Sequence, residues 1–271
     1  MPELPEVETT RRGIVGHCVG KKVDRVVVRD GRLRWPVPQA LVRQLPGQII
    51  EAVERRGKYL LLRTQAGTLL MHLGMSGSLH VVSAATQVQK HDHLDIVLSD
   101  QSCLRLRDPR RFGAALWTVG DPLLHPLLVK LGPEPLGEDF HADYLYQRSR
   151  GRRTAVKQFI MDSRVVAGVG NIYANEAMFG AGIRPVRTAG SLSLARCERL
   201  VRMIRQVLQQ ALEHGGTTLR DFRKSDGMPG YFQQQLSVYG RAGLSCPVCE
   251  RSVRLVRLGQ RATYYCAHCQ R

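Results

Sequence analysis

The sequence predicts an α+β protein with a mostly β amino-terminal domain, a helical second domain and a small cysteine-rich third unit. A length of 271 residues allows roughly two domains of about 150 residues. From Val23 to about Val119, short runs of β-branched residues and leucine alternate with Gly, Asp and Ser turns, which is typical of an antiparallel sandwich or barrel. After Glu138 the apolar residues recur at helical spacing. We expect domains at residues 1–131, 132–236 and 237–271.

The first domain opens with an amphipathic segment, in which Val7, Thr10 and Ile14 fall on one helical face. Eight candidate strands follow, and the turn residues between them predict a sandwich or barrel with little parallel sheet. The expected strands are Val23–Arg29, Ile49–Arg55, Tyr59–Thr64, Thr68–Leu73, Ser78–Val82, Leu94–Leu98, Cys103–Arg107 and Ala114–Val119.

The second domain is expected to be helical. Four prolines and two glycines between Asp121 and Glu138 indicate a linker before it. The expected helices are Thr154–Met161, Ile172–Phe179 and Leu194–Leu212. Ser191 or Ser193 can cap the last of them, and Gly215-Gly216 can end it. Arg220–Gln235 shows no clear period and is expected to be a loop.

The composition points to a polyanionic partner. The chain has 40 Lys+Arg against 23 Asp+Glu, a net charge of +17, of which residues 1–131 carry +7 and the rest +10. This excess favours a nucleic acid as the partner. No apolar run approaches the roughly 18 residues that a membrane helix needs, and the acidic amino terminus differs from a secretion signal. We therefore expect a cytoplasmic protein.

The strongest single motif is a pair of Cys-x₂-Cys sequences, Cys246/Cys249 and Cys266/Cys269, whose ligand type and spacing predict a four-thiolate zinc site. Val253–Leu258 and Thr263–Tyr265 are expected to form two strands joined by residues 259–262, with Arg261 at the tip. His268 is expected to be a bystander, because four thiolates complete a tetrahedron. Cys18, Cys103 and Cys197 are interpreted as buried thiols.

A second candidate feature is Gly170-Asn171 before a helix. Free amide groups at a helix start attract phosphate, and glycine allows close approach, although most such pairs only cap the helix. Asn171 is interpreted as that cap. Arg152, Arg153 and Lys157, placed on the preceding helix, can either follow a DNA backbone or form a solvated face.

The amino terminus combines an unusual nucleophile with carboxylates. Removal of Met1 exposes the secondary amine of Pro2. An α-amine has a pKa of about 8, far below the pKa of a lysine side chain. Attack on an aldehyde-like carbon gives an iminium, which is always cationic, and Glu3 and Glu6 can transfer protons beside it. The alternative is a proline in a first helical turn followed by acidic residues that favour the helix dipole.

These motifs together resemble the formamidopyrimidine-DNA glycosylases, bacterial base-excision repair enzymes, from Met1 to Arg271. They follow the family's order. The matching segments are Pro2–Glu6, Gly57–Tyr59, His72–Gly77, Lys90–His93, Asp108–Gly113, Gly168–Tyr173, Ser225–Phe232 and the four cysteines. The resemblance implies a β-sandwich, a helical domain of helix-two-turn-helix type and a zinc β-ribbon finger.

The resemblance also implies roles for individual residues. Pro2 corresponds to the nucleophile that attacks C1′ of the damaged nucleotide, Glu3 to its acid/base, and Lys58 to the family's catalytic lysine. Met75, Arg110 and Phe112 match the residues that fill the gap left by the flipped base, with Arg110 facing the orphaned cytosine. DNA-backbone contacts are implied for His91, Arg152 and Asn171, and the last elimination step is assigned to Arg261.

The implied activity is removal of oxidised purines, such as 8-oxoguanine and formamidopyrimidines, from duplex DNA, followed by β,δ-elimination at the abasic site. The implied cofactor is one structural Zn²⁺, and the expected state is a monomer at the nucleoid. Arg220 departs from the lysine that many relatives carry. His91 and His93 can alternatively be interpreted as a metal pair.

Two other functions remain open at this level. The related endonuclease VIII class uses the same amine chemistry on oxidised pyrimidines, but Leu4 together with Met75, Arg110 and Phe112 favours the purine-directed branch. A DNA-binding zinc-ribbon protein without catalysis would also account for the charge and the cysteines.

Overall fold

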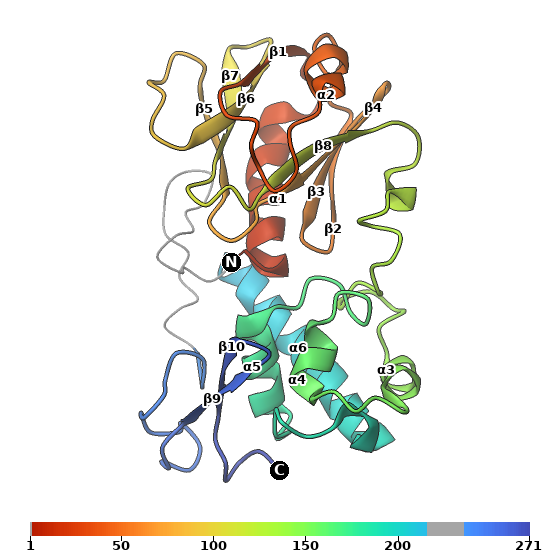
Figure 1. Ribbon diagram of the computed structural model, residues 1–271, viewed down its shortest axis with the longest axis vertical. Coiled ribbons are helices and arrows are strands. Elements are labelled where there is room, and N and C mark those ends of the chain that lie inside the picture. The colour runs from red at the N-terminus through yellow and green to blue at the C-terminus, as the bar shows by residue number, and fades with distance from the viewer. Residues whose placement is uncertain (1, 216–235) are drawn as a thin grey trace. The chain divides into compact units, whose positions relative to one another are not determined.

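Two four-stranded antiparallel sheets dominate the first part of the chain in the computed structural model, which describes residues 2–215 and 236–271 (Figure 1). One sheet has the order β1-β6-β7-β5 and the other β2-β3-β4-β8. The strands are β1 Val23–Val28, β2 Ala52–Arg56, β3 Tyr59–Thr64, β4 Gly67–His72, β5 Ser78–Ser83, β6 Asp92–Leu98, β7 Ser102–Arg107 and β8 Ala114–Thr118. The predicted β-sandwich and its eight strands are confirmed.

The strand predicted from Ile49 begins later than expected. Ile49 makes only an isolated bridge with Lys22, and the continuous ladder of β2 starts at Ala52, opposite Arg63. One hydrophobic core includes buried side chains from both sheets, such as Leu60 and Ile96, and from the first helix. The sandwich is therefore closed by side chains from both layers and from that helix.

Helix α1, Leu4–Cys18, contacts strands of both sheets and carries the predicted apolar face. It starts with a capping box, in which the Glu3 and Glu6 side chains each accept a backbone N–H of the other residue. Val7 and Ile14 on its inner face are buried in the sandwich core. A short helix that the sequence did not predict, α2 Gln39–Gln44, follows Pro38.

The helical part of the chain contains α3 Ala142–Ser149, α4 Val156–Met161, α5 Asn171–Gly180 and α6 Leu194–Glu213, with short 3₁₀ turns at Pro122–Leu124 and Ala189–Ser191. Helix α3 was not predicted. Ser193 caps α6 as expected, since its Oγ accepts the Arg196 N–H at 3.3 Å. Helix α5 packs on α6 and on β10, which buries most of its residues.

The cysteine-rich end contains a hairpin of β9 Arg254–Leu258 and β10 Arg261–Tyr265. Its turn is two residues long, and Gly259 and Gln260 have φ values of 52° and 63°, as a type I′ turn requires. The predicted four-residue turn is therefore corrected. Arg261 is the first residue of β10, opposite Leu258, and lies beside the tip.

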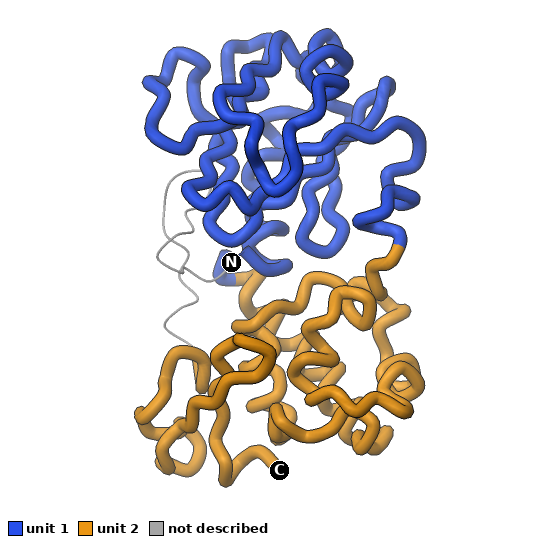
Figure 2. Tube along the Cα trace, viewed as in Figure 1, with its two compact units in different colours: residues 1–129, 214–231 blue, residues 130–213, 232–271 orange. Residues whose placement is uncertain are grey.

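The described residues divide into two compact units (Figure 2). Residues 2–129 with 214–215 form unit 1, and residues 130–213 with 236–271 form unit 2. Helices α3 to α6 and the cysteine-rich hairpin thus belong to one unit. The predicted loop Arg220–Gln235, including Arg220, and the predicted helix stop at Gly216 lie within residues 216–235, which are outside the described residues. Within the described ranges, no helix has the length and apolarity needed to cross a membrane.

Candidate functional site

The amino-terminal candidates lie at the start of α1 in unit 1. Pro2 is buried, and Glu3 is 1% exposed. Glu3 is the N-cap residue of α1, and its N–H donates to Glu6 Oε2 at 2.8 Å. The proline in the first helical turn is Pro5, so Pro2 precedes the helix. A buried carboxylate pair therefore directly follows the candidate nucleophile, at the end of the helix where negative charge is favourable.

Lys58 lies in the two-residue turn between β2 and β3, after Gly57, whose φ of 58° suits glycine. Lys58 is half-buried. Burial and, to a smaller extent, the positive charges of Lys58 and Arg34 together lower the pKa of His72 to about 4. His72 is therefore neutral at neutral pH, and its Nδ1 accepts the Gly74 N–H at 3.0 Å.

The three candidate gap-filling residues lie on two adjoining loops of unit 1. Arg110 and Phe112 share one loop, where the guanidinium carbon of Arg110 lies 4.9 Å from the centre of the Phe112 ring. Phe112 is 45% exposed, which is unusual for a large apolar side chain. Met75 follows Gly74, where a Cβ would lie 2.4 Å from the Phe112 carbonyl carbon. The structure therefore brings all three side chains to neighbouring loops.

Asp108 joins these loops and was not singled out by sequence reasoning. It is fully buried, and its carboxylate accepts Ser76 Oγ at 3.0 Å and the Gly113 N–H at 2.7 Å. Its backbone N–H donates to the His91 carbonyl at 3.0 Å. Asp108 thus holds the Met75, His91 and Arg110 segments together. Its place at the start of the Asp108–Gly113 motif was the available signal.

His91 is half-buried, and its φ of 76° lies in the left-handed region. His93 is buried, and its Nε2 lies 2.9 Å from the carbonyl oxygen of Asp108. The hypothesis of a His91/His93 metal pair gains no support, because the only group of three or more metal-binding side chains found in the described chain is the four-cysteine set.

The basic residues of unit 2 differ from the sequence interpretation. Arg152 and Arg153 are exposed, but they lie in the loop between α3 and α4 and not on a helix. Lys157 does lie on α4, yet it is only 1% exposed and is therefore not part of a basic surface. Its Nζ donates to the Ala262 carbonyl and to Thr263 Oγ1, both at 2.7 Å. Lys157 is therefore a buried link between α4 and the hairpin.

Asn171 also contacts the hairpin. It is the first residue of α5, the N-cap is Gly170, and no side chain caps this helix, so the predicted Asn171 cap is wrong. Instead, Asn171 Nδ2 donates to the Ala262 carbonyl at 3.2 Å. Its Oδ1 is buried without a hydrogen-bond partner. Asn175, one turn later, accepts the Tyr264 N–H at 2.8 Å, so α5 fixes the position of β10.

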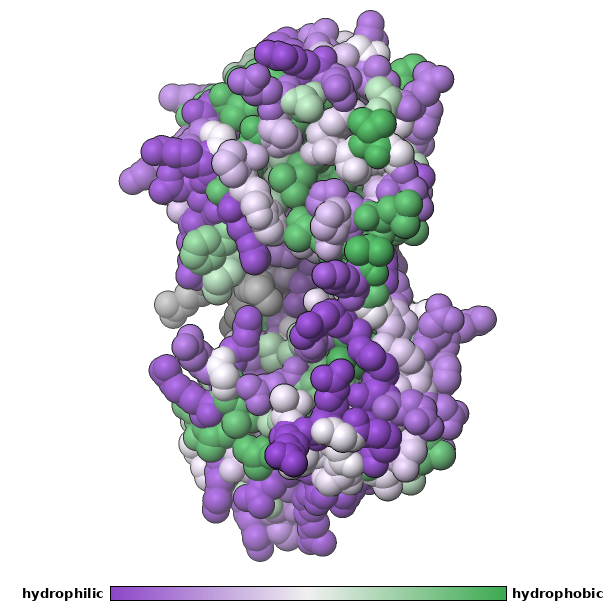
Figure 3. All heavy atoms as spheres, turned by 45° about the vertical axis from the view of Figure 1, so that its right-hand side comes forward, coloured by the Kyte–Doolittle hydropathy of each residue, from purple (hydrophilic) through white to green (hydrophobic). Residues whose placement is uncertain are grey.

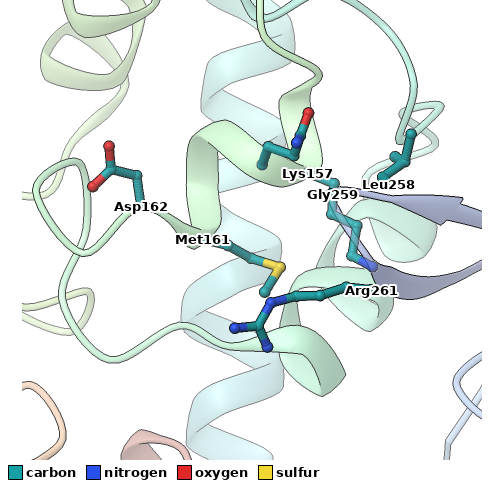
Figure 4. A pocket seen from close by; sticks show the side chains of 7 residues that line it. Lys157, Met161, Asp162, Leu258, Gly259 and Arg261 are labelled. Carbon is teal, nitrogen blue, oxygen red and sulfur yellow. The ribbon is translucent and has the colours of Figure 1, made fainter.

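Arg261 lines a pocket of ≈ 220 Å³ together with residues of α4 and the hairpin turn (Figure 4). Figure 4 shows its guanidinium beside the sulfur of Met161. Asp162 lies at the same pocket. Hydrogen bonds from Arg164 lower the pKa of Asp162, and the charges of Arg164 and Arg152 lower it further. Arg152 and Arg261 are therefore both basic groups near the end of α4.

The four predicted zinc ligands come together at the base of the hairpin. Cys246, Cys249, Cys266 and Cys269 have sulfur atoms within 4.8 Å of one another. Tetrahedral Zn²⁺ with Zn–S bonds of about 2.3 Å needs sulfurs about 3.8 Å apart, so the donor set fits the metal. His268 is exposed and outside the group, as predicted. Cys18, Cys103 and Cys197 are free and buried, which confirms their interpretation.

Comparison with known proteins decides the family. Three family models match the chain: the formamidopyrimidine-DNA glycosylase N-terminal domain over residues 1–115, its H2TH domain over 131–223, and a zinc finger found in FPG and IleRS over 243–271. The chain belongs to the formamidopyrimidine-DNA glycosylase family. The fold of the family, with its β-sandwich, H2TH domain and zinc finger holding one structural zinc, is the fold expected from the sequence.

Individual members of the glycosylase family match over their whole length. The formamidopyrimidine-DNA glycosylase of Stutzerimonas stutzeri (strain A1501) is 63% identical over 271 residues, covering 100% of both chains. The crystal structure of the MutM (Fpg) protein of Thermus thermophilus matches with a TM-score of 0.89 and 40% identity, over 99% of this chain and 98% of that one. A Lactococcus lactis FPG mutant in complex with a Fapy-dG containing DNA matches with a TM-score of 0.93 and 31% identity, over 99% of each chain.

Proposed function

We propose that this glycosylase removes oxidised purines, 8-oxoguanine and formamidopyrimidines, from duplex DNA and then cleaves the abasic site by β,δ-elimination. The observation that carries the proposal is the buried Pro2-Glu3 pair at the start of α1, with Glu6 in the same capping box. The related Lactococcus lactis protein has been crystallised with Fapy-dG DNA and with DNA containing an abasic site, which supports both substrates.

In the proposed mechanism, the neutral amine of Pro2 attacks C1′ and the bond to the damaged base breaks. Glu3 transfers the protons that base departure and sugar opening require. The resulting iminium withdraws electrons, so that a C2′ proton is lost and the C3′–O bond breaks. The conjugated iminium then loses a C4′ proton, and the C5′–O bond breaks. Each step leaves a phosphate on the DNA, and the product is a gap with phosphate at each end.

The other site residues have supporting roles in this proposal. Lys58 acts beside the lesion and its phosphate. Met75, Arg110 and Phe112 fill the gap left by the flipped base, which offsets an unstacking cost of a few kcal/mol. His91, Arg152 and Asn171 bind the DNA backbone, and Arg261 assists the last elimination. Zinc holds the finger that carries Arg261 and takes no part in the chemistry. Since DNA is the substrate, we propose that the enzyme acts at the nucleoid in the cytoplasm. We also propose that it acts as a monomer.

Borohydride trapping tests the nucleophile. The substrate is a duplex with one 8-oxoguanine opposite cytosine, and wild type is compared with Pro2→Gly after mass spectrometry has verified removal of Met1. We expect a covalent adduct that maps to Pro2 in the wild type and none in the variant. Correctly processed wild-type protein that binds the duplex but gives no adduct would favour the DNA-binding alternative without catalysis.

A second duplex tests the substrate class. Under the same conditions, excision of 8-oxoguanine is compared with excision of thymine glycol, an oxidised pyrimidine. We expect a strong preference for 8-oxoguanine. The opposite preference, with the Pro2 adduct retained, would assign the endonuclease VIII activity to the same amine chemistry.

A further inference from the structure

A basic pocket lies in unit 2 where the last residues of the chain meet the loop after α5. It has a volume of ≈ 500 Å³ and is lined by Arg184, Arg187 and Arg271, with the hydroxyl-bearing residues Thr188 and Ser191. In the view of Figure 3, hydrophilic side chains cover much of the surface of unit 2. None of these pocket residues takes part in the proposed reaction.

The backbone around the pocket is fixed by hydrogen bonds. Arg184–Arg187 form a turn closed by the Arg187 N–H and the Arg184 carbonyl at 3.1 Å. The Arg187 carbonyl accepts the Val156 N–H at 2.7 Å, which anchors the turn to α4. On the other side, the Gln270 side chain donates to the Ile183 carbonyl at 2.9 Å. The arginine side chains are therefore presented from a rigid frame, which lowers the entropic cost of binding.

The guanidinium groups of this frame lack acidic side-chain partners. Arg184, Arg187, Arg196 and Arg271 form no ion pair with any acidic side chain of the described chain, and Arg187 Nε is buried without a hydrogen-bond partner. Burial lowers the pKa of Arg187, and the charge of Arg196 lowers it further. In contrast, Arg29 and Arg105 in unit 1 share Asp95. Guanidinium groups that are held close together without acidic side-chain partners repel one another, and a bound anion would offset this repulsion.

A second basic pocket adjoins the first and extends this surface. It is lined by Arg251, Arg254 and His268, and it shares Ala267 and Arg271 with the first pocket. Several positive side chains thus lie along one continuous strip, as is typical of a surface that follows a polyanion.

The strip is distinct from the Asn171–Arg261 group in the same unit. Asn171 begins α5 and Arg184 follows its end, and a helix of ten residues is about 15 Å long. Arg261 begins β10, whereas Ala267 follows its end, and five strand residues span about 16 Å. The basic pocket therefore lies at the other end of both elements from the Asn171–Arg261 group.

We propose that the Arg184–Arg187–Arg271 pocket binds a phosphate group, and that its source is the sugar–phosphate backbone of a second stretch of DNA. Guanidinium groups bind phosphate oxygens in pairs, and the neighbouring hydroxyls suit the remaining oxygens. Free inorganic phosphate has the same chemistry and is the alternative source. A second phosphate site lets the enzyme contact another DNA segment while the first one occupies the lesion site.

The test measures a second binding event on enzyme whose first site is already filled. The full-length protein is saturated with a duplex that carries a stable abasic-site analogue, and a fluorescent undamaged duplex is then added and followed by anisotropy over a range of salt concentrations. The variant is Arg184→Gln/Arg271→Gln, which changes two exposed side chains. The control, Arg199→Gln/Arg202→Gln, removes the same charge from exposed positions of α6.

We expect the pocket variant to weaken the second event at least fivefold and to reduce its salt dependence by about two phosphate contacts, while first-site affinity and the control stay unchanged. Equal weakening by both variants, or no weakening, would overturn the proposal. A parallel arm adds inorganic phosphate and observes the arginine Nε–H signals by NMR. Phosphate-induced shifts at Arg187 without second-duplex binding would keep the phosphate site and reject DNA as its source.

Discussion

Glu8 shows how one buried carboxylate organises the beginning of the chain. Its two oxygens accept hydrogen bonds from Arg11, Arg12 and Arg55 at 2.9 to 3.1 Å. Burial alone would raise the pKa of Glu8, but the hydrogen bonds and charges of these arginines outweigh it and lower the pKa to about 2. Glu8 is therefore ionised throughout the neutral range and stabilises unit 1 there.

The first prediction concerns Glu8→Gln. A pKa that is lower in the folded state gives stability that is fully present above the unfolded value, near 4.5, and is lost as the pH falls toward 2. We expect the variant to be less stable at pH 7 by roughly 2 kcal/mol, since partial exposure reduces the full linkage value. The difference should shrink at pH 3.5. Both tryptophans, Trp35 and Trp117, lie in unit 1, so urea unfolding followed by their fluorescence measures this.

Destabilisation that is equal at the two pH values would show that Glu8 acts through packing and not through its charge. Glu51→Gln, an exposed carboxylate before β2, is the matched control and should leave the urea midpoint unchanged.

At the scale of elements, Arg55 joins α1 to the β2–β3 hairpin. Its Nε donates to Glu8 at 3.1 Å, and its Nη1 donates to the Gly57 carbonyl at 3.0 Å, one residue before Lys58. The helix that follows Pro2 and the turn that carries Lys58 are thus connected through a single guanidinium. This makes Arg55 a positioning residue for the proposed catalytic groups.

The second prediction is a double-mutant cycle. We expect Arg55→Met to lower the rate of 8-oxoguanine excision about tenfold, because the Lys58 turn loses its anchor, and to have almost no effect when Lys58 is already alanine. Single-turnover kinetics on the 8-oxoguanine duplex measures each rate. Arg63→Met on β3, whose Nε lies 3.9 Å from a Glu54 carboxylate oxygen, serves as the control. Additive losses in the Arg55/Lys58 pair would mean that Arg55 acts independently of Lys58.

The third prediction concerns the connection between α4 and the zinc-finger hairpin. Lys157→Met removes both 2.7 Å hydrogen bonds to residues 262 and 263 and leaves the Ala262 carbonyl with the weaker Asn171 contact. The neighbouring Arg261 then loses its fixed position, and we expect roughly tenfold weaker binding of a lesion duplex with the zinc content unchanged.

Fluorescence anisotropy and metal analysis measure these two quantities. Lys130→Met, the same change at an exposed lysine, is expected to have little effect. Unchanged affinity in Lys157→Met would show that the hairpin is held by α5 and the metal alone.

The elements also show what a sequence can and cannot predict here. The cysteine spacing identified the zinc ligands because coordination depends on short local motifs, and the β-sandwich followed from alternation and turn residues. The burial of Lys157 depends on a partner 105 residues away, which no local pattern encodes. Helices α2 and α3, with 6 and 8 residues, were not predicted, whereas α4, with 6 residues, was. Helices this short depend mainly on tertiary packing, so their own sequence is a weak guide to them.

For the molecule as a whole, the zinc finger is the part least able to fold alone. Its buried cluster contains only Val238, Cys246, Val253 and Cys266, so two of its four members are metal ligands. The rest of unit 2 contacts it at defined points, among them Glu176, whose carboxylate accepts the N–H groups of Ser237, Val238 and Tyr239 at 2.8 to 3.0 Å. Metal binding therefore supplies much of the folding free energy of this end of the chain.

The fourth prediction follows from this dependence. Removal of zinc by a strong chelator should unfold the finger, release Arg261 from its place beside α4 and weaken lesion-duplex binding at least tenfold, with excision falling in parallel. Tryptophan fluorescence should not change, because Trp35 and Trp117 lie in unit 1. Added zinc should restore binding and excision together. A zinc-free enzyme that still binds the duplex with full affinity but no longer excises the base would contradict a structural role and assign the metal to the chemistry itself.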